Sequence, residues 1–561
     1  MFIKQSKSKT SDKTQLYLVE GYRDGKTIKH RTIKKYGALE DLILKDPDIL
    51  NKLKIEAKRL TLEKEENIIS LILDLNQNND HSTNVKNIGS SFIEKVFESL
   101  ELKTLINDLT VDEKFKYDLY EILSFLVTMR IIKPASKLDN YLNKQFLYKD
   151  YDLSLDDIYR SLDKLFCYKA EIIKHLDDHM VKDYQRDKTV VYYDVTNYYF
   201  ESNQTSDLRE IGPSKENVKH PIVTMGLYID EHNYPITYDM FKGNTHDSKT
   251  FIPSFNKIRD DLNVKKCIVV ADKGINGGNN IKHLIDHGHG YIFSSKIRGA
   301  SQKIIDLTLD EKDYIKLSDQ FKYKEATMKR KVIYANEMGR SKSIEVEEKI
   351  VIFYSKNYAD KAKHERDKVL ESLEIYINNP KLLKGKTKQG RLKYLKQQEL
   401  NETTGEIVES KLIVSKDTSK IQKDESLDGF YMISTNQIDL SASEIISKYR
   451  GLWQIEKSFR IIKSELEGRP IYLEKDERIQ GHFLTCFITL LVSRIIEKKL
   501  ENKYSIDKIQ NALQDMNVVE IENGIYKVMK YTQVQIDIQK TLGNLIDKTY
   551  IKKEHLNQLL K

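Results

Sequence analysis

The spacing of apolar and polar residues changes several times along the chain, and each change predicts a different kind of element. Residues 15–35 form two strand-like runs around Asp24-Gly25, a dipeptide typical of tight hairpin turns. They predict a basic β-hairpin. From Ala38 to about Leu75 apolar residues recur at helical spacing, and residues 76–87, "NQNNDHSTNVKN", have the composition of a polar linker.

Residues from about 91 to 185 again follow a helical period. In "SLDDIYRSLDKLF", Ser154 stands where a helix cap is expected, just before two aspartates. Short helices joined by short polar turns suit a DNA reader of the helix-turn-helix type. They suit equally a helical bundle that only packs, and the pattern leaves both interpretations open.

Strand patterns begin at Lys188, with "KTVVYYDVTNYYFES" and then "HPIVTMGLYIDEHNYPITYDMFKGN". The runs "VKKCIVVADKGINGG" and "GYIFSSK" add shorter strands with helical segments between them, which predicts a mixed α/β sheet. From 298 to about 428 lysine-rich alternating runs predict an inserted, basic, β-rich subdomain. "GFYMISTN" then resumes the earlier pattern, and a polar helical tail with one short strand, "GIYKVM", follows residue 497.

At 561 residues the chain is too long for one core. The pattern divides it into segments 1–80, 81–187, 188–297, 298–427, 428–497 and 498–561. The net charge of +8 is mild, and the three widely spaced cysteines encode neither a zinc site nor a disulfide framework. Residues 1–13 have no apolar core, so we expect no signal peptide, and the apolar run from His482 to Ile496 is shorter than a membrane span. We expect a protein of a reducing compartment, the cytoplasm, with a buried helix at that run.

Two aspartates follow predicted strands. Asp194 ends the run "VVYY" and Asp272 ends the run "CIVVA", so each is expected at the carboxyl edge of a sheet, where α/β proteins place ligands. A single aspartate at such a position is more often a turn former or cap. Two of them in one predicted sheet favour a functional site.

A helix beginning near Ser441 carries the third candidate carboxylate, Glu456. Ser441 and Glu444 form a capping box, and apolar residues recur at the spacing of a buried stripe, at Leu452, Ile455, Phe459, Ile462 and Leu466. The edge of the same helix carries Tyr449, Glu456 and Lys463 at intervals of seven, with Trp453 and Arg460 a turn either side of Glu456. A solvated face with a Glu456–Arg460 pair would explain the charges, but it gains nothing from an exposed tryptophan.

Three carboxylates converging from two strands and a helix would make an oxygen-only site for Mg²⁺. Two such ions about 4 Å apart can activate a water or 3′-hydroxyl and stabilise the leaving oxygen of a phosphodiester displacement. Lys463 and Arg460 would then hold phosphates, Tyr449 would donate a hydroxyl, and Trp453 would pack on a sugar or base.

The motifs "YYDVTNYYFE", "FKGNTHDSKTF", "VVADKGINGG" and "YRGLWQIEKSFRIIKSELEGRPIY" together resemble a DDE transposase of bacterial insertion sequences, in the insertion sequence four superfamily and its sixteen-thirty-four branch. The resemblance covers nearly the whole chain. It implies a ribonuclease H-like core in which Asp194, Asp272 and Glu456 are the catalytic triad. In the family's Tyr, Arg, Glu, Lys signature, Tyr449 and Lys463 match, but Leu452 occupies the arginine position, so Arg450 or Arg460 would have to substitute.

The resemblance further implies two Mg²⁺ ions, with Mn²⁺ as a substitute, and double-stranded DNA partners, both transposon ends and target. It implies cut-and-paste movement, and because that chemistry involves two ends, we expect a homodimer on DNA. It places "GNTHDSKT" beside the active site, with Asn244, His246 and Asp247 around the ligands and His246 as a hydrogen-bonding residue; by pattern alone Asp247 or Ser248 is a helix cap. The basic run of the insertion is expected to contact phosphates through Lys381, Lys384, Lys386, Lys388 and Arg391.

Two other functions remain open on the sequence. One is a DNA-binding product of a decayed element without catalysis, against which the intact triad argues. The other is a non-transposing nuclease on the same core, against which the basic N-terminal hairpin and helices argue, because they imply recognition of DNA ends.

Overall fold

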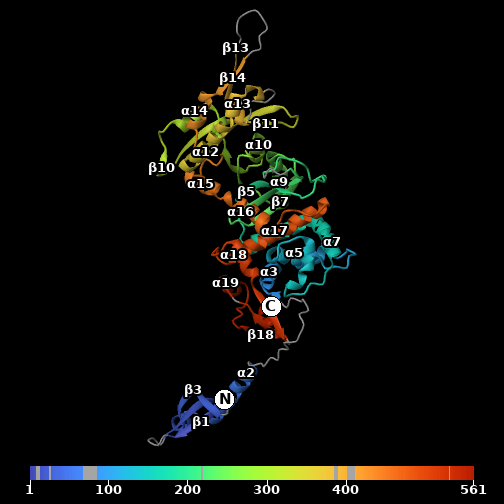
Figure 1. Cartoon of the computed structure of the whole chain (residues 1–561), viewed down its shortest axis with the longest axis vertical. Helices are drawn as coiled ribbons and strands as arrows, with labels where there is room; N and C mark the ends of the chain where they lie inside the picture. The colour runs from blue at the N-terminus through green and yellow to red at the C-terminus, as the bar shows by residue number, and fades with distance from the viewer. Residues whose placement is uncertain are drawn as a thin grey trace, which may run out of the picture. The chain divides into compact units, whose positions relative to one another are not determined.

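The computed structural model describes residues 1–7, 13–24, 27–66, 85–215, 219–383, 390–400, 411–522, 524–529 and 531–561 (Figure 1). The chain forms two compact units, Met1–Thr83 and Asn84–Lys561.

The first unit contains a three-stranded antiparallel sheet and two helices. The predicted hairpin is present as β2 (Thr14–Asp24) and β3 (Thr27–Ala38), although Gly25 of its expected turn lies outside the described residues. β1 (Phe2–Lys7), which the pattern does not predict, pairs with β2. α1 (Leu39–Ile43) and α2 (Ile49–Glu66) follow at the predicted helical spacing. A small core is buried between sheet and helices: Leu16, Leu18, Val19, Ala38, Leu53 and Ala57.

The second unit begins with a short strand, β4 (Val85–Asn87), where the pattern predicts the end of a linker. Helices follow up to residue 184: α3 (Gly89–Glu98), α4 (Leu102–Thr110), α5 (Leu119–Ile132), α6 (Lys137–Leu142), α7 (Leu155–Cys167) and α8 (Lys169–Tyr184), with a 3₁₀ turn at Lys144–Phe146. Ser154 caps α7, as predicted, by accepting a hydrogen bond from the Asp157 N–H.

A nine-stranded mixed sheet forms the centre of this unit, in the order β10-β11-β12-β15-β9-β8-β5-β6-β7. β5 runs parallel to β8, and β8 runs parallel to β9, while β5, β6 and β7 form an antiparallel meander. The elements of this part are β5 (Val190–Tyr199), β6 (Ile222–Asp230), β7 (Pro235–Lys242), α9 (Asp247–Asp261), β8 (Ile268–Ala271), α10 (Gly278–Asp286) and β9 (Gly290–Ser295).

The sequence predicts a separate β-rich insertion at 298–427, but its long strands extend the central sheet. β12 pairs with β15 from Lys349↔Thr435 to Tyr354↔Phe430, because both strands carry continuous apolar runs that need burial on two faces. The elements of this region are a 3₁₀ turn at Ile297–Gly299, α11 (Gln302–Leu309), β10 (Ile315–Ser318), β11 (Phe321–Ala335), β12 (Ser341–Ser355), α12 (Lys356–Ser372), α13 (Glu374–Asn378), 3₁₀ turns at Pro380–Leu383 and Gly390–Tyr394, β13 (Leu395–Leu400), β14 (Lys411–Lys416), α14 (Thr418–Ser426) and β15 (Phe430–Thr435).

α17 (Asp476–Lys499) is long and apolar enough to cross a membrane, but 94% of its apolar window is buried inside the protein. It packs against α3, α5, α7 and β7, so it is the buried core helix that the sequence predicts.

The expectation of a tail with one strand is wrong. β16 (Asn517–Glu522), β17 (Ile525–Val528) and β18 (Tyr550–Lys552) form a sheet with β4, accompanied by α18 (Ile506–Gln514), α19 (Gln533–Leu542) and α20 (Lys553–Leu560). Strands of three to six residues are too short to leave a clear periodic signal, and β4 pairs with β16 from more than 400 positions away.

Candidate functional site

Asp194 lies in the middle of β5, which continues to Tyr199 because residues beyond the aspartate still pair with β6. The prediction that Asp194 ends its strand is therefore wrong. Its side chain is half-buried, and burial raises the pKa of the carboxyl group to about 6. The negative charges of Asp272 and Glu456 raise this pKa further, while the ammonium of Lys215 lowers it. Asp272 and Glu456 therefore lie close enough to Asp194 for their charges to change its pKa.

Asp272 directly follows β8, as predicted. β8 is parallel to β5, and Ala271 pairs with Tyr193, so the next residues along both strands, Asp272 and Asp194, stand level at adjacent positions. The Asp272 carboxylate accepts a hydrogen bond of 2.6 Å from the Ser294 hydroxyl of β9. Sequence reasoning missed Ser294, and only its place in the third parallel strand would have indicated it.

The helix that brings Glu456 to this edge is interrupted, and the prediction of one continuous helix is wrong. α15 (Ala442–Arg450) begins at the predicted capping box, and α16 (Trp453–Arg460) continues into a π-helical turn at Ile461–Glu465. At the junction, the N–H groups of Leu452 and Gln454 bond three residues back, to Tyr449 and Gly451. Gly451 lies so close to Tyr192 of β5 that a Cβ there would overlap the tyrosine hydroxyl.

The predicted apolar stripe is confirmed, because all five of its residues are buried: Leu452, Ile455, Phe459, Ile462 and Leu466. α16 packs through this stripe on β5 and β6, which turns its other edge outward. Glu456 is exposed on that edge and still close enough to raise the pKa of Asp194. The stripe therefore positions the third carboxylate.

Tyr449 and Lys463 lie on either side of the carboxylates. Burial raises the pKa of the Tyr449 hydroxyl, the Asp272 charge adds to the shift, and the Ser294 hydroxyl lowers it, so Tyr449 lies beside Asp272 and Ser294. The ammonium of Lys463 donates to the hydroxyl of Thr196 over 2.8 Å and stands 5.3 Å from the centre of the Tyr198 ring. Lys463 is thus held on β5, two residues beyond Asp194.

Both arginine candidates are exposed. Arg460 is largely exposed and lies 3.9 Å from Glu465, so the Glu456–Arg460 pair of a simple solvated face is absent from the described ion pairs. Arg450 is exposed on α15, 5.6 Å from the centre of the Phe321 ring. Neither arginine is seen to replace the missing signature arginine at Leu452, which is buried.

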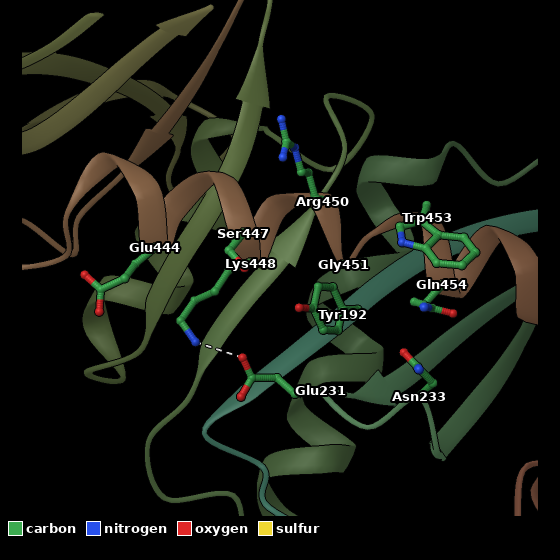
Figure 2. A pocket seen from close by; sticks show the side chains of 10 residues that line it. All are labelled: Tyr192, Glu231, Asn233, Glu444, Ser447, Lys448, Arg450, Gly451, Trp453 and Gln454. Atoms are coloured by element: carbon green, nitrogen blue, oxygen red, sulfur yellow. Dashed lines mark hydrogen bonds and ion pairs between the residues drawn. The ribbon is translucent and has the colours of Figure 1, made fainter. Parts of the chain in front are cut away.

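A cavity of about 450 Å³ opens around Tyr192 and Gly451 (Figure 2). Trp453, Gln454 and Asn233 lie on one side of Tyr192, and the Lys448–Glu231 ion pair of 2.8 Å lies on the other. Trp453 is 54% exposed, which leaves its ring available to a ligand. The cavity therefore offers an aromatic surface and polar groups next to the helix that carries Glu456.

The segment "GNTHDSKT" is only partly as predicted. The cap of α9 is His246, whose ring nitrogen accepts from the Ser248 N–H, and not Asp247 or Ser248. The Asp247 carboxylate lies 3.5 Å from the Lys215 ammonium, which also acts on Asp194, so Asp247 does border the site. Asn244 is exposed in the preceding turn, and no contact with the carboxylates is seen for it.

Comparison with known proteins identifies the family. Residues 185–492, more than half of the chain, match the model of the transposase DDE domain, and residues 3–76 match the N-terminal domain of IS1634 family transposases. The chain belongs to the DDE transposases of the IS1634 branch. A piggyBac transposase, solved as a synaptic complex with hairpin DNA, is similar at 10% identity and a TM-score of 0.37, over 78% of this chain and 81% of that one. A comparison with curated proteins finds no match.

The basic run of this transposase's insertion is described only in part. Lys381 is exposed, whereas Lys384, Lys386 and Lys388 lie outside the described residues. Arg391 donates to the Tyr376 hydroxyl over 3.3 Å and stands over the tyrosine ring. Arg391 therefore packs against another side chain of the insertion.

The three carboxylates of this DDE transposase offer oxygen atoms, which are the ligands that hard divalent cations prefer. Within the described part of the chain, no group of three or more His, Cys, Asp or Glu side chains is arranged so that it could hold a metal ion. Asp194, Asp272 and Glu456 stand instead on three neighbouring elements, and the charges of Asp272 and Glu456 both raise the pKa of the Asp194 carboxyl group. Carboxylate oxygens are the type of ligand that Mg²⁺ prefers in proteins.

Asp194→Asn should stabilise the metal-free transposase at pH 8. The folded-state pKa of about 6 lies above that of an unfolded aspartate, so the folded state loses stability as pH rises through 6. We expect a gain of roughly 1 to 2 kcal/mol, discounted for the half-exposed side chain, that shrinks toward zero as pH falls to 4. Urea unfolding across this range measures it, with exposed Asp152→Asn as the control. A constant difference at all pH values would refute the raised pKa of Asp194 as the cause.

Proposed function

We propose that this protein is the DNA transposase of an insertion sequence, which binds terminal inverted repeats and performs Mg²⁺-dependent strand cleavage and strand transfer by a cut-and-paste route. The observation that carries the proposal is the meeting of Asp194 and Asp272, from adjacent parallel strands, with Glu456 from the packed helix. The family membership supports the same reaction class. Single carboxylates at strand ends are common, but a carboxylate whose pKa is raised by the charges of two others supports a functional site.

The strand order β7-β6-β5-β8-β9 supports a ribonuclease H-like core. In this proposal, the antiparallel meander and two further parallel strands form that core, and β10–β12 are additions on its β9 side. Such a core would place the first aspartate on its central strand, where the Asp194 carboxylate meets the side chain that follows β8.

Two Mg²⁺ ions held by Asp194, Asp272 and Glu456, or Mn²⁺ in their place, would activate the attacking oxygen and stabilise the leaving one. Ser294 orients the Asp272 carboxylate by its hydrogen bond. Lys463, anchored on Thr196, would present its charge to a phosphate beside Asp194, and Tyr449 would donate its hydroxyl. Arg450 and Arg460 would approach the DNA backbone from the exposed side, and Trp453 would pack on a sugar or base.

The partners in this proposal are the element's ends and a target duplex, bound by a homodimer in the bacterial cytoplasm. The first unit and the helices α3–α8 would recognise the ends. Two ends must be processed for one excision, and a dimer on DNA supplies one active site for each.

Cleavage of end-containing DNA, compared with unrelated DNA of equal length, tests this function. The proposal predicts Mg²⁺-dependent cuts at the boundary of the element's own terminal repeat and joined products with a target duplex. Binding of the end without cleavage would mean a DNA-binding protein that has lost catalysis. Equal cleavage of both DNAs without joining would mean a nuclease.

The insertion's basic run gives a second prediction about DNA. Replacing Lys381, Lys384, Lys386 and Lys388 together by Gln should weaken binding to all DNA sequences alike. The slope of the logarithm of the binding constant against the logarithm of the salt concentration should fall in magnitude by about 3 to 4, because each phosphate contact contributes roughly 0.9. Titrations at several salt concentrations measure the slope. Four exposed lysines of α12 and α14 serve as the matched control: Lys361, Lys363, Lys368 and Lys420. An unchanged slope would mean that these lysines do not contact DNA phosphates.

A further inference from the structure

Part of the first unit is a two-stranded ribbon. β1 pairs with β2 only as far as Phe2↔Val19, whereas β2 and β3 continue pairing to Asp24↔Thr27. From Glu20 onward, β2 therefore pairs with one strand, β3, among the described residues. We call Glu20–Arg23 with Thr27–Arg31 the ribbon. A two-stranded hairpin is only marginally stable by itself in water, so contacts with a binding partner would stabilise the ribbon.

The ribbon's surface combines positive charge with exposed apolar groups. Every residue of β3 from Thr27 to Lys35 is exposed. Ile28 is 70% and Tyr22 is 47% exposed, and both stand among the cations Arg23, Lys29 and Arg31. At the base of the ribbon, Glu20 forms an ion pair with Lys64 of α2, which offsets its negative charge. The ribbon thus presents cations and apolar side chains to solvent.

The register distributes these groups over both faces. Tyr22 pairs with Lys29, and Arg23 pairs with Ile28, so each face carries one cation beside one apolar side chain. Arg31 pairs with Glu20 on the same face as Tyr22. At the base of the other face, the His30 ring contacts the Phe2 ring edge-on at 5.4 Å, which anchors the ribbon to β1.

We propose that this ribbon lies in the major groove of the DNA that the transposase recognises; the inference rests on the proposed function above. The major groove, about 12 Å wide, admits a two-stranded ribbon as it stands, whereas the minor groove, about 6 Å wide, would first have to be widened, which costs deformation energy. A ribbon with cations on both faces places charge near both phosphate walls. Ile28 and Tyr22 reach base edges, where an apolar side chain contacts the thymine methyl group.

The test compares two triple variants of the full-length chain on a duplex that carries the element's end. In Arg23→Gln/Lys29→Gln/Arg31→Gln, affinity should fall at least tenfold and the salt slope should fall by about 2 to 3. The control, Lys45→Gln/Lys54→Gln/Lys58→Gln, removes the same charge from exposed positions on the helical side of the unit and should bind within twofold of the wild type. Equal losses in both variants, or none in the first, would overturn the ribbon as the contact.

Dimethyl sulphate footprinting identifies the groove, since it methylates guanine N7 in the major groove and adenine N3 in the minor groove. The wild type should protect guanine N7 within the end, and the ribbon variant should lose that protection. Protection confined to adenine N3, or guanine protection that the variant retains, would overturn the proposal. A wild type that does not bind the end at all would instead contradict the proposed function, so the two failures are distinguishable.

Discussion

Phe459→Ala should destabilise the second unit by roughly 3 to 5 kcal/mol, because the side chain is 5% exposed and its removal leaves a cavity where α16 packs on β5 and β6. Denaturant unfolding followed by circular dichroism measures this loss. Cleavage per folded molecule should stay within a few fold of the wild type, since Phe459 lies on the buried stripe and not on the exposed edge that carries Glu456.

Lys463→Met is the matched comparison on the same helical segment. It removes one hydrogen bond to Thr196 and a charge beside Asp194, so stability should fall by roughly 1 kcal/mol while cleavage per folded molecule falls strongly. If Lys463→Met were as destabilising as Phe459→Ala, with no separate loss of activity, the polar edge of the helix would be structural.

Alanine in place of Asp194, Asp272 or Glu456 should lower strand cleavage by roughly a thousandfold or more, since each change would remove a ligand from the proposed two-metal centre. Binding of the end should remain within a few fold, because none of the three is buried in the apolar core. Single-turnover cleavage and binding titrations on the same DNA separate the two effects. Wild-type cleavage rates in any one variant would remove that residue from the triad.

Local pattern was sufficient where a residue's role depends on its own element. The Val- and Tyr-rich runs predicted β5 and β8, and the stripe through Phe459 predicted which side of the Glu456 helix is buried. The capping box at Ser441 fixed where that helix begins. These signals lie within one turn or one strand, so they can be read without knowing the partner elements.

Other features depend on contacts between distant segments. Residue 451 must be glycine because Tyr192, more than 250 positions earlier, occupies the space of a Cβ. Ser294 reaches Asp272 only because β9 lies beside β8, and β12 joins the sheet only because β15 offers an edge. No periodicity in any of these segments encodes its neighbour, and one sequence does not reveal the strand order.

We propose that Asp194, Asp272 and Glu456 bind the metal ions required for DNA cleavage. Replacement of one of these carboxylates by a thiol tests this proposal most directly. Cleavage of the element's end by Asp272→Cys should be measured in Mg²⁺ and in Mn²⁺ beside the wild type, because a thiolate is a poor ligand for Mg²⁺ and a better one for Mn²⁺. We predict a ratio of Mn²⁺ to Mg²⁺ rates at least tenfold above that of the wild type. An unchanged ratio, with cleavage retained in Mg²⁺, would contradict the assignment of Asp272 as a metal ligand.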